Sequence, residues 1–381
     1  MISVRRVSSK KEQREFVNFP LRLYKDCKQF VPPLYGDEMK MFRKNYVYYD
    51  TSEAVYFLAY RDGEVVGRIS GILQKAANEK WKQKRVRFTR FDSIHDKEVA
   101  RALFAAVEDW AREKGMEEVV GPLGFNDMER EGMLIEGFEH LATFEEQYNY
   151  DYYLSLLEEC GYEKEVDWVE SMVRAREEDD GKLARMSDLI ARRYKLRYCE
   201  AKNTGEFIER YGNMFFDLID ASYSEIYGTV PFTDGMKKML IGNFRLIIKK
   251  EYVTVILDEE ENPVCLGLCF PSIAKAVQKS GGRLTPGCIL RILKALKAPE
   301  ILDLALIGVA PEWEKKGVSV MIASELDKML RNSPTIQFAE TNLNLEDNYA
   351  IRNLWKQRFD SVEHKRRRSF VKRLNESGEK V

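Results

Sequence analysis

Residues 55–73 read Val55-Tyr-Phe-Leu-Ala-Tyr-Arg-Asp-Gly-Glu-Val-Val-Gly-Arg-Ile-Ser-Gly-Ile-Leu73. Two apolar runs flank an Asp-Gly dipeptide, and this arrangement predicts a β-hairpin because Asp and Gly adopt the positive φ of a tight turn. A second such segment, Tyr252–Phe270, has two apolar runs around a polar turn. Gly67 of the first segment and Gly267 of the second hold matching places 200 residues apart. The sequence therefore predicts an internal repeat that begins each time with a hairpin.

The same order of elements follows both hairpins. After the first, the pattern predicts a strand at 85–91, a helix at 97–114, a strand at 118–121, a helix at 150–160 and a strand at 167–174. After the second, it predicts a strand at 302–309, a helix at 318–330, a strand at 335–341, a helix at 349–358 and a strand at 367–374. Each half is thus an α/β arrangement of about 180 residues. We expect two domains, residues 1–178 and 179–381.

Composition narrows the function. The 381 residues carry 61 Lys and Arg against 62 Asp and Glu, a formal net charge of −1, so we expect no nucleic-acid partner. The longest apolar run is about ten residues, whereas a membrane-spanning helix needs roughly 20. Six cysteines without a Cys-x-x-Cys pair and three histidines give little material for a metal site. Because charges stand where a signal peptide is apolar, we expect a reduced, metal-free, cytoplasmic protein.

A candidate phosphate-binding loop follows the predicted strand 302–309. The segment Val309-Ala-Pro-Glu-Trp-Glu-Lys-Lys-Gly-Val-Ser-Val-Met-Ile322 leads into the next helix. The first N–H groups of a helix lack intrahelical partners and, with the helix dipole, can hold a diphosphate. Gly317 lets the backbone approach a phosphate closely, and Lys315 and Lys316 add positive charge. The alternative is an ordinary helix start with solvated lysines.

This loop resembles the acyl-CoA loop of the GNAT acyltransferases, usually Arg/Gln-x-x-Gly-x-Gly/Ala after a Val-x-Pro turn. Here Val309-Ala-Pro311 precedes Glu314-Lys-Lys-Gly-Val-Ser319. The turn and the central glycine match. Glu314 and Ser319 depart from the usual first and last residues, and Glu314 would repel a phosphate.

A resemblance over nearly the whole chain is to the YghO-like family, which includes bacterial ceramide synthases and carries tandem GNAT domains. It rests on several ordered segments, Phe30-Val-Pro-Pro-Leu34, Phe57-Leu-Ala-Tyr-Arg-Asp-Gly-Glu-Val-Val-Gly-Arg-Ile69, Gly121-Pro-Leu-Gly-Phe-Asn-Asp127, Gly132-Met-Leu-Ile-Glu-Gly-Phe138, Gly282-Arg-Leu-Thr-Pro-Gly-Cys-Ile-Leu290 and Leu345-Glu-Asp-Asn348. It implies an α/β (α+β) protein of two tandem GNAT-like domains, each a mixed, mostly antiparallel sheet flanked by helices. We expect acyl-CoA in the C-terminal domain only. The first-half counterpart of its loop, Asp92-Ser-Ile-His-Asp-Lys-Glu98, has no glycine and three acids that repel a diphosphate.

The resemblance also implies site residues. It places a pantetheine slot along Leu306–Val309, and it assigns the acyl-CoA contacts to Val309, Lys315, Lys316, Gly317, Val318, Ser319 and Asn348. On the opposing strand, predicted to run from Phe338 to Asn344, Glu340 and Asn342 share a face by the two-residue period. Glu340 is the candidate base or amine anchor, and a solvated edge-strand carboxylate is the alternative.

GNAT enzymes often use a tyrosine on their fourth helix as general acid, and Leu354 stands at that place here. Tyr223 and Tyr227 are the candidate catalytic substitutes, with a role in the aromatic core as the alternative.

Two basic segments have two interpretations each. In Pro286–Pro299, Arg291, Lys294 and Lys297 recur every third residue, opposite Ile289, Ile292, Leu293 and Leu296. This helix is predicted either to pack on its own domain or to contact a membrane surface or an acyl chain. The run His364-Lys-Arg-Arg-Arg368 alternates into the last strand, which favours a solvated strand face over a nucleic-acid site.

The leading hypothesis is an N-acyltransferase that uses acetyl-CoA or a longer acyl-CoA and a small-molecule or lipid-type amine. The alternative is a non-catalytic GNAT-like ligand-binding protein. Aminoacyl transfer from charged tRNA fits the net charge poorly. The sequence leaves the acceptor, the acyl length and the oligomeric state open.

Overall fold

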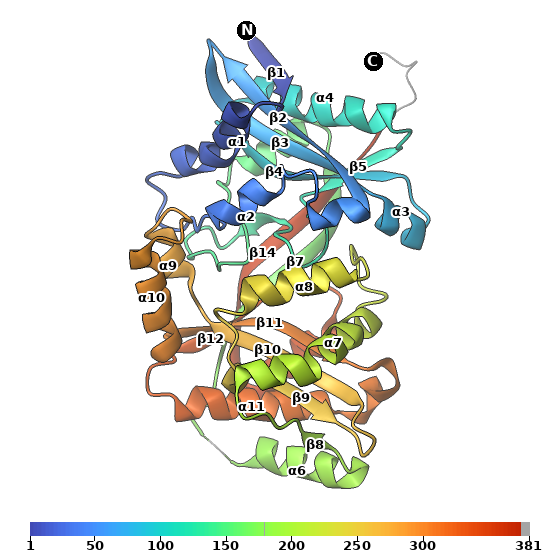
Figure 1. The fold of residues 1–381 in the computed structure, drawn as a ribbon, viewed down its shortest axis with the longest axis vertical. Coiled ribbons are helices and arrows are strands. Elements are labelled where there is room, and N and C mark those ends of the chain that lie inside the picture. Colours follow the sequence, from blue (N-terminus) through green and yellow to red (C-terminus); the bar gives the residue numbers. More distant parts are fainter. Residues whose placement is uncertain (179, 375–381) are drawn as a thin grey trace. The chain divides into compact units, whose positions relative to one another are not determined.

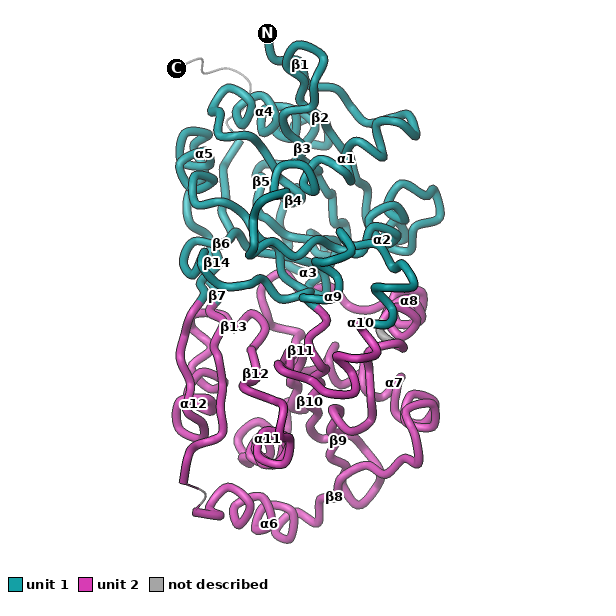
Figure 2. The backbone as a smooth tube through the Cα atoms, turned by 90° about the vertical axis from the view of Figure 1, so that its left-hand side faces the viewer, with its two compact units in different colours: residues 1–168, 274–290, 365–381 teal, residues 169–273, 291–364 magenta. Residues whose placement is uncertain are grey.

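The computed structural model describes residues 1–178 and 180–374. By contacts the chain forms two compact units (Figure 2). Unit 1 comprises residues 1–168, 274–290 and the chain from 365 onward, and unit 2 comprises residues 169–273 and 291–364. Two segments of the second half therefore group with the first half. The linear boundary between 178 and 179 stays a prediction about the repeat.

The first half of the chain follows the predicted order (Figure 1). Its elements are β1 (Ile2–Arg6), α1 (Lys10–Leu23), α2 (Tyr35–Lys40), β2 (Ser52–Arg61), β3 (Glu64–Gln74), α3 (Lys75–Trp81), β4 (Arg85–Ser93), α4 (Lys97–Glu113), β5 (Glu118–Gly121), β6 (Met133–Glu136), α5 (Tyr153–Glu159) and β7 (Glu163–Arg174). The hairpin β2–β3 turns at Asp62 and Gly63, both with positive φ, as the Asp-Gly dipeptide predicted.

The second half repeats this order. Its elements are α6 (Lys182–Tyr194), β8 (Arg197–Tyr198), α7 (Thr204–Ser222), α8 (Asp234–Phe244), β9 (Val253–Leu257), β10 (Pro263–Pro271), α9 (Ala274–Gln278), α10 (Pro286–Lys297), β11 (Ile301–Val309), α11 (Ser319–Asn332), β12 (Phe338–Thr341), β13 (Asn344–Leu345), α12 (Tyr349–Arg358) and β14 (Asp360–Arg373).

Both units build their sheet in the same strand order. In unit 1 the order is β1-β2-β3-β4-β5-β14, and in unit 2 it is β8-β9-β10-β11-β12-β7. The pairs β4–β5 and β11–β12 are parallel, whereas β1–β2, β2–β3, β3–β4, β5–β14, β8–β9, β9–β10, β10–β11 and β12–β7 are antiparallel. The predicted fold class, a mixed and mostly antiparallel α/β fold flanked by helices, is confirmed, although the expected two sheets are the two parts of one continuous hydrogen-bonded sheet.

The last strand of each half of the sequence pairs with strands of the other half. β14 pairs with β5 through Phe370–Arg373, and β7 pairs with β12 through Met172 and Val173. These residues of β14 belong to unit 1, and these residues of β7 belong to unit 2. Each unit therefore contains a strand from the other half of the sequence.

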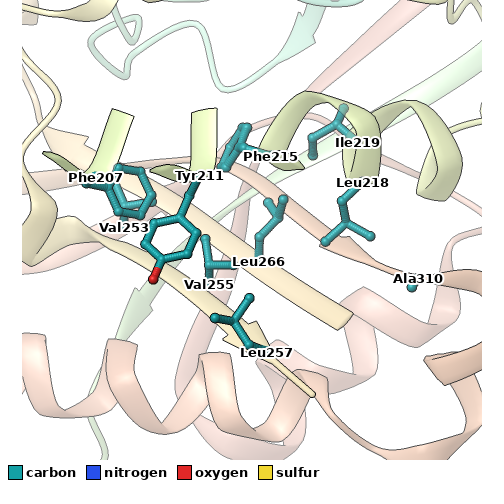
Figure 3. Packing of buried hydrophobic residues seen from close by; sticks show 10 residues of the cluster. All are labelled: Phe207, Tyr211, Phe215, Leu218, Ile219, Val253, Val255, Leu257, Leu266 and Ala310. Atoms are coloured by element: carbon teal, nitrogen blue, oxygen red, sulfur yellow. The ribbon is translucent and has the colours of Figure 1, made fainter. Parts of the chain in front are cut away.

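Helix α7 covers one face of the unit 2 sheet. Asn203 caps it by accepting the N–H of Glu206 (3.0 Å), and Phe207, Tyr211, Phe215 and Ile219, four residues apart and buried, face the sheet. Figure 3 shows the cluster that they form with Val253, Val255 and Leu257 of β9 and Leu266 of β10. The alternate side chains Ile256 and Cys265 pack instead with α11. Helices α7 and α11 therefore cover opposite faces of this sheet.

One sequence-based interpretation changes in the last strand, β14. Lys365 and Arg367 are fully buried, so the interpretation of residues 364–368 as a solvated strand face was wrong. Arg367 donates to the carbonyl of Gln147, while Arg366 and Arg368 bind Asp167.

In residues 1–178 and 180–374, no helix is long and apolar enough to cross a bilayer.

Candidate active site

The parallel strands β11 and β12 separate after four residue pairs. Their register runs from Ile301 opposite Phe338 to Leu304 opposite Thr341. The N–H of Asn342 still donates to the carbonyl of Leu304 (3.0 Å), but β12 has ended, whereas β11 continues to Val309. Beyond Leu304 the two strands therefore splay apart. The strand that was predicted to reach Asn344 ends at Thr341.

A β-bulge lies at the point of separation. On β10, Leu268 pairs with Leu306 and the next residue, Cys269, pairs with Leu304, so Ala305 is the extra residue on β11. A bulge leaves the extra residue outside the regular ladder and bends the strand. It also keeps Leu304 and Ile307 on the α11 face, while Leu306 packs toward α7.

An apolar pocket occupies the splay, within unit 2. Residues 304–307 of β11 form one wall, the loop 341–344 forms another, and Trp355 of α12 adds an aromatic surface. Ile322, Leu326 and Met329 line it from α11, whereas Tyr223 lines it from the C-terminal end of α7. Because α7 and α11 cover opposite faces, the pocket passes between the strands from one face of the sheet to the other.

The predicted phosphate loop lies at the end of the long strand. Pro311–Lys316 forms a 3-10 turn, Gly317 has φ 75°, and Val318 is the N-cap of α11 without a side-chain hydrogen bond to the helix. The helix therefore begins at Ser319 without a side-chain cap. The Val320 N–H donates to the Gly317 carbonyl (3.1 Å) and the Met321 N–H to the Val318 carbonyl (2.9 Å), so an anion would bind at the preceding N–H groups, those of Val318 and Ser319. Val309 and the buried Val318 pack with the α11 face of the core.

The two lysines of the loop differ in environment. Lys315 is exposed, as is Glu314. Lys316 is half-buried, and its ammonium lies 3.8 Å from the ring centroid of Trp313 and 5.8 Å from that of Tyr194. These aromatic contacts hold its charge beside the helix start.

The corresponding loop of unit 1 is closed by its own side chain. The Asp96 carboxylate accepts the N–H groups of Glu98 (2.9 Å) and Val99 (3.3 Å) at the start of α4, and it also binds Arg61. The pKa of Asp96 is lowered, first by the Arg61 hydrogen bond. A carboxylate thus occupies the place that a phosphate would take.

The splay of unit 1 is also filled. Gly67 pairs with Ser93 and Gly267 pairs with Ile307, so Ser93 and Ile307 hold the same place in the two copies. The Tyr153 hydroxyl accepts the Ser93 N–H (3.0 Å), and the Tyr152 hydroxyl donates to the Ser93 carbonyl (2.8 Å). In unit 2 the matching Ile307 lines the pocket.

A buried hydrogen-bond network holds the Tyr153 hydroxyl in this position. Tyr24 donates to Asp92 (3.0 Å) and contacts the Tyr153 hydroxyl (2.8 Å), while Arg68 donates to Asp92 (2.7 Å). Burial raises the pKa of Asp92, and the charge of Arg68 opposes that rise.

Glu340 is not a solvated edge carboxylate. Its Oε1 lies 2.9 Å from His364 Nε2, and both side chains are under 10% exposed. Asp303, also buried, is the β11 partner of Glu340 and shares its face. The intervening residues Leu302 and Ala339 pack with α11 and α12, so these acids point toward the α7 face. His364 was not predicted as a site residue, because its only sequence signal is a basic run.

Of the remaining predicted residues, some line the pocket and others do not. Asn342 and Tyr223 line the pocket, and the Tyr223 hydroxyl donates to the Ile307 carbonyl (3.1 Å). The residues that line this pocket do not include Glu340, Tyr227 or Asn348. Asn348 caps α12 by accepting the N–H of Ile351 (3.3 Å). Leu354 packs against the core beneath α12.

Comparison with known proteins supports this geometry. No family model matches the chain. Protein YghO of Escherichia coli (strain K12) is 24% identical over 380 residues, 97% of this chain and 95% of YghO. The bacterial ceramide synthase of Caulobacter vibrioides (strain NA1000 / CB15N) is 24% identical over 326 residues, 82% of each chain.

A solved structure shows the same fold. The tandem GNAT protein from the clavulanic acid biosynthesis pathway superposes with a TM-score of 0.57 at 11% identity, over 99% of this chain and 100% of that one. The chain therefore has the tandem GNAT fold, and it is similar over most of its length to YghO and to the bacterial ceramide synthase.

Proposed function

We propose that the protein is an acyl-CoA-dependent N-acyltransferase whose donor site is the splay of unit 2. The observation that carries this proposal is the apolar pocket between β11 and β12, which adjoins the uncapped start of α11. A thioester donor with a long, thin pantetheine arm and a diphosphate needs such a slot next to an anion site. In the first copy, side chains occupy both features.

The donor is oriented by three parts of the chain. The N–H groups of Val318 and Ser319 receive the diphosphate, and Lys315 and Lys316 supply positive charge beside them. Gly317 permits the close approach because its backbone is left-handed and carries no side chain. The walls of the pocket exclude water from the pantetheine arm.

The bulge places backbone polarity at the reacting carbon. The Ala305 peptide lies outside the regular ladder and borders the pocket. An N–H in this position donates to the thioester carbonyl and strengthens as the oxygen gains negative charge. The amine nitrogen attacks the carbonyl carbon, the carbon–sulfur bond breaks, and the thiolate leaves and is protonated.

The proton of the amine goes to the Glu340–His364 pair. This pair lies on the α7 face, at the last paired residues of β11 and β12, and the pocket opens toward that face at Tyr223. Tyr223 is the candidate acid for the leaving thiolate, since its hydroxyl is at the pocket, whereas Tyr227 is outside the lining. A buried proton acceptor matches the requirement of direct attack by an amine.

The acceptor class follows from the relatives and not from the pocket alone. The ceramide synthase relative motivates a lipid-type amine, and the apolar walls suit a long acyl chain. The test measures thiol release from acetyl-CoA and palmitoyl-CoA with a panel of small and long-chain amines. We expect amine-dependent release with at least one donor. If acyl-CoA binds saturably but no amine of the panel causes thiol release, the alternative of a ligand-binding protein is favoured.

A pair of variants localises the reaction. Gly317→Glu puts a carboxylate in the anion site at a left-handed position, and Gly115→Glu in unit 1 imposes the same backbone strain where no atom lies within 4 Å. We expect Gly317→Glu to lower kcat/KM at least about a hundredfold, because it repels the diphosphate. Gly115→Glu keeps the wild-type value. Equal losses in both variants would contradict the placement of the donor.

A further inference from the structure

Helix α10 has apolar side chains on two sides, one buried against the protein and the other exposed. Cys288, Ile292 and Leu296, four residues apart, are buried and anchor the helix to the protein. Leu290 and Leu293 lie three residues apart on the opposite side and are 68% and 49% exposed. The predicted apolar face of Ile289, Ile292, Leu293 and Leu296 is thus divided, because Ile289 is also exposed.

This surface is unusual for the chain. Among the described residues, nine large hydrophobic side chains are exposed, and four of them lie within the ten residues 284–293. The four are Leu284, Ile289, Leu290 and Leu293, and the other five are scattered along the sequence. Singly exposed hydrophobic residues are ordinary, whereas a cluster marks an interaction surface.

The same segment is strongly basic. From Ile273 to Pro299 the sequence has six basic residues and no acidic one, in a chain whose total charge is −1; they are Lys275, Lys279, Arg283, Arg291, Lys294 and Lys297. Lys294 and Lys297 are exposed on α10 itself, beside the leucines. Arg283 stacks on Tyr35 and donates to Asn18, so it is held at the base of the helix.

We propose that α10 docks the protein on an anionic membrane surface. An amphipathic helix with leucines and lysines on one exposed face inserts its apolar side chains at the headgroup boundary and places its ammonium groups among lipid phosphates. A protein partner of matching acidic character is the competing occupant. The membrane is favoured because the exposed leucines and lysines share one stripe of the helix, and because the whole segment 273–299 has six basic residues and no acidic one, a charge that matches anionic headgroups. Docking on lipid needs no acyl transfer, so it stands independently of the proposed function.

The test is vesicle co-sedimentation of the full chain. Vesicles of phosphatidylcholine alone are compared with vesicles that contain phosphatidylglycerol as well. We expect binding to the anionic vesicles that is about tenfold tighter than to the neutral ones and that weakens as salt is raised, since the lysine contribution is screened. Equal binding to both vesicles, or none to either, would overturn the proposal.

Matched variants assign the contact to α10. Leu290→Asn with Leu293→Asn removes the apolar contact, and we expect about tenfold weaker binding. The control, Leu189→Asn with Val362→Asn, removes side chains that are also 68% and 49% exposed but lie on α6 and β14. It keeps wild-type binding, and circular dichroism melts of both variants match the wild type. Equal losses in the two variants would overturn the assignment.

Light scattering of the free protein tests whether a second copy of the chain covers the helix. We expect the same molar mass for the wild type and the Leu290→Asn, Leu293→Asn variant across protein concentration. A concentration-dependent dimer that this variant abolishes would show that a second copy of the chain covers the helix, and would overturn the membrane assignment.

Discussion

At the scale of single residues, the Glu340–His364 pair carries the chemistry that we propose. Both side chains are buried, and their facing atoms are 2.9 Å apart. Glu340→Gln keeps the size of the side chain and removes its negative charge. We expect kcat to fall by about 10²–10⁴ in Glu340→Gln, with unchanged acyl-CoA affinity, because only the proton acceptor is lost. Single-turnover kinetics and acyl-CoA titration measure the two quantities separately.

The partner of this pair supplies a control. His364→Gln keeps a hydrogen bond to Glu340 but cannot accept the proton as imidazole does. We expect a loss of kcat in His364→Gln with unchanged acyl-CoA affinity. Wild-type kcat in both variants would contradict a catalytic role of the pair and leave it a structural one.

Glu131 is a second residue-scale case, in unit 1. Burial raises its pKa well above the usual range, and the charges of Asp127 and Glu146 add to that rise, while Arg87 opposes it. Below its folded pKa, the folded protein binds a proton that the unfolded chain releases at lower pH. The free energy of unfolding therefore falls as pH rises through the window above the unfolded value of about 4.3.

Glu131→Gln removes this dependence. The neutral amide keeps the size of the side chain without a buried charge, so we expect the variant to be more stable at pH 7 by about 1 kcal/mol or more. Urea unfolding between pH 5 and pH 7 measures it, and the gap to the wild type should shrink as pH falls. A variant less stable than the wild type at pH 7 would show that the carboxylate is stabilised by its surroundings.

At the scale of elements, the starts of α4 and α11 distinguish the two copies. Asp96 caps α4, whereas no side chain caps α11. We expect Asp96→Ala to lower the free energy of unfolding by about 1 kcal/mol, because two N–H groups lose their acceptor. Acyl-CoA affinity should not change, since that site is in unit 2. A thermal melt and a titration on the same variant check both, and a changed affinity would argue that α4 takes part in binding.

The element scale also shows what local pattern can predict. The two hairpins, the helices α4, α11 and α12 and the strand β5 were predicted within a few residues, because turn dipeptides and apolar periodicity are local signals. The loop at Gly317 before α11 was predicted for the same reason. The separation of β11 and β12 was expected only through the resemblance, since the bulge at Ala305 has no marker in the sequence.

Other parts of the site depend on distant contacts. Glu340 and His364 lie on different strands, and Tyr153 reaches Ser93 from α5, 60 residues along the chain. The exchange of β7 and β14 is of the same kind, because the strands look alike whichever sheet they complete. Which side of α10 is buried likewise depends on its neighbours, so the helix period alone divided its faces wrongly.

At the scale of the whole molecule, one fold occurs twice, and side chains occupy the proposed donor site in the first copy but not in the second. In unit 1, Asp96 and Tyr153 occupy the anion site and the splay. In unit 2 no side chain caps α11, and Ile307, at the place of Ser93, lines the pocket. The account therefore predicts one acyl-CoA site per chain, although the fold is duplicated. The first copy contributes structure, including the sheet that β14 completes.

Isothermal titration with acetyl-CoA and palmitoyl-CoA tests this claim most directly. The account predicts saturable binding of at least one donor at a single site per chain, abolished in Gly317→Glu and retained in Gly115→Glu. Absence of saturable heat with both donors, two sites per chain, or full affinity in Gly317→Glu would contradict it.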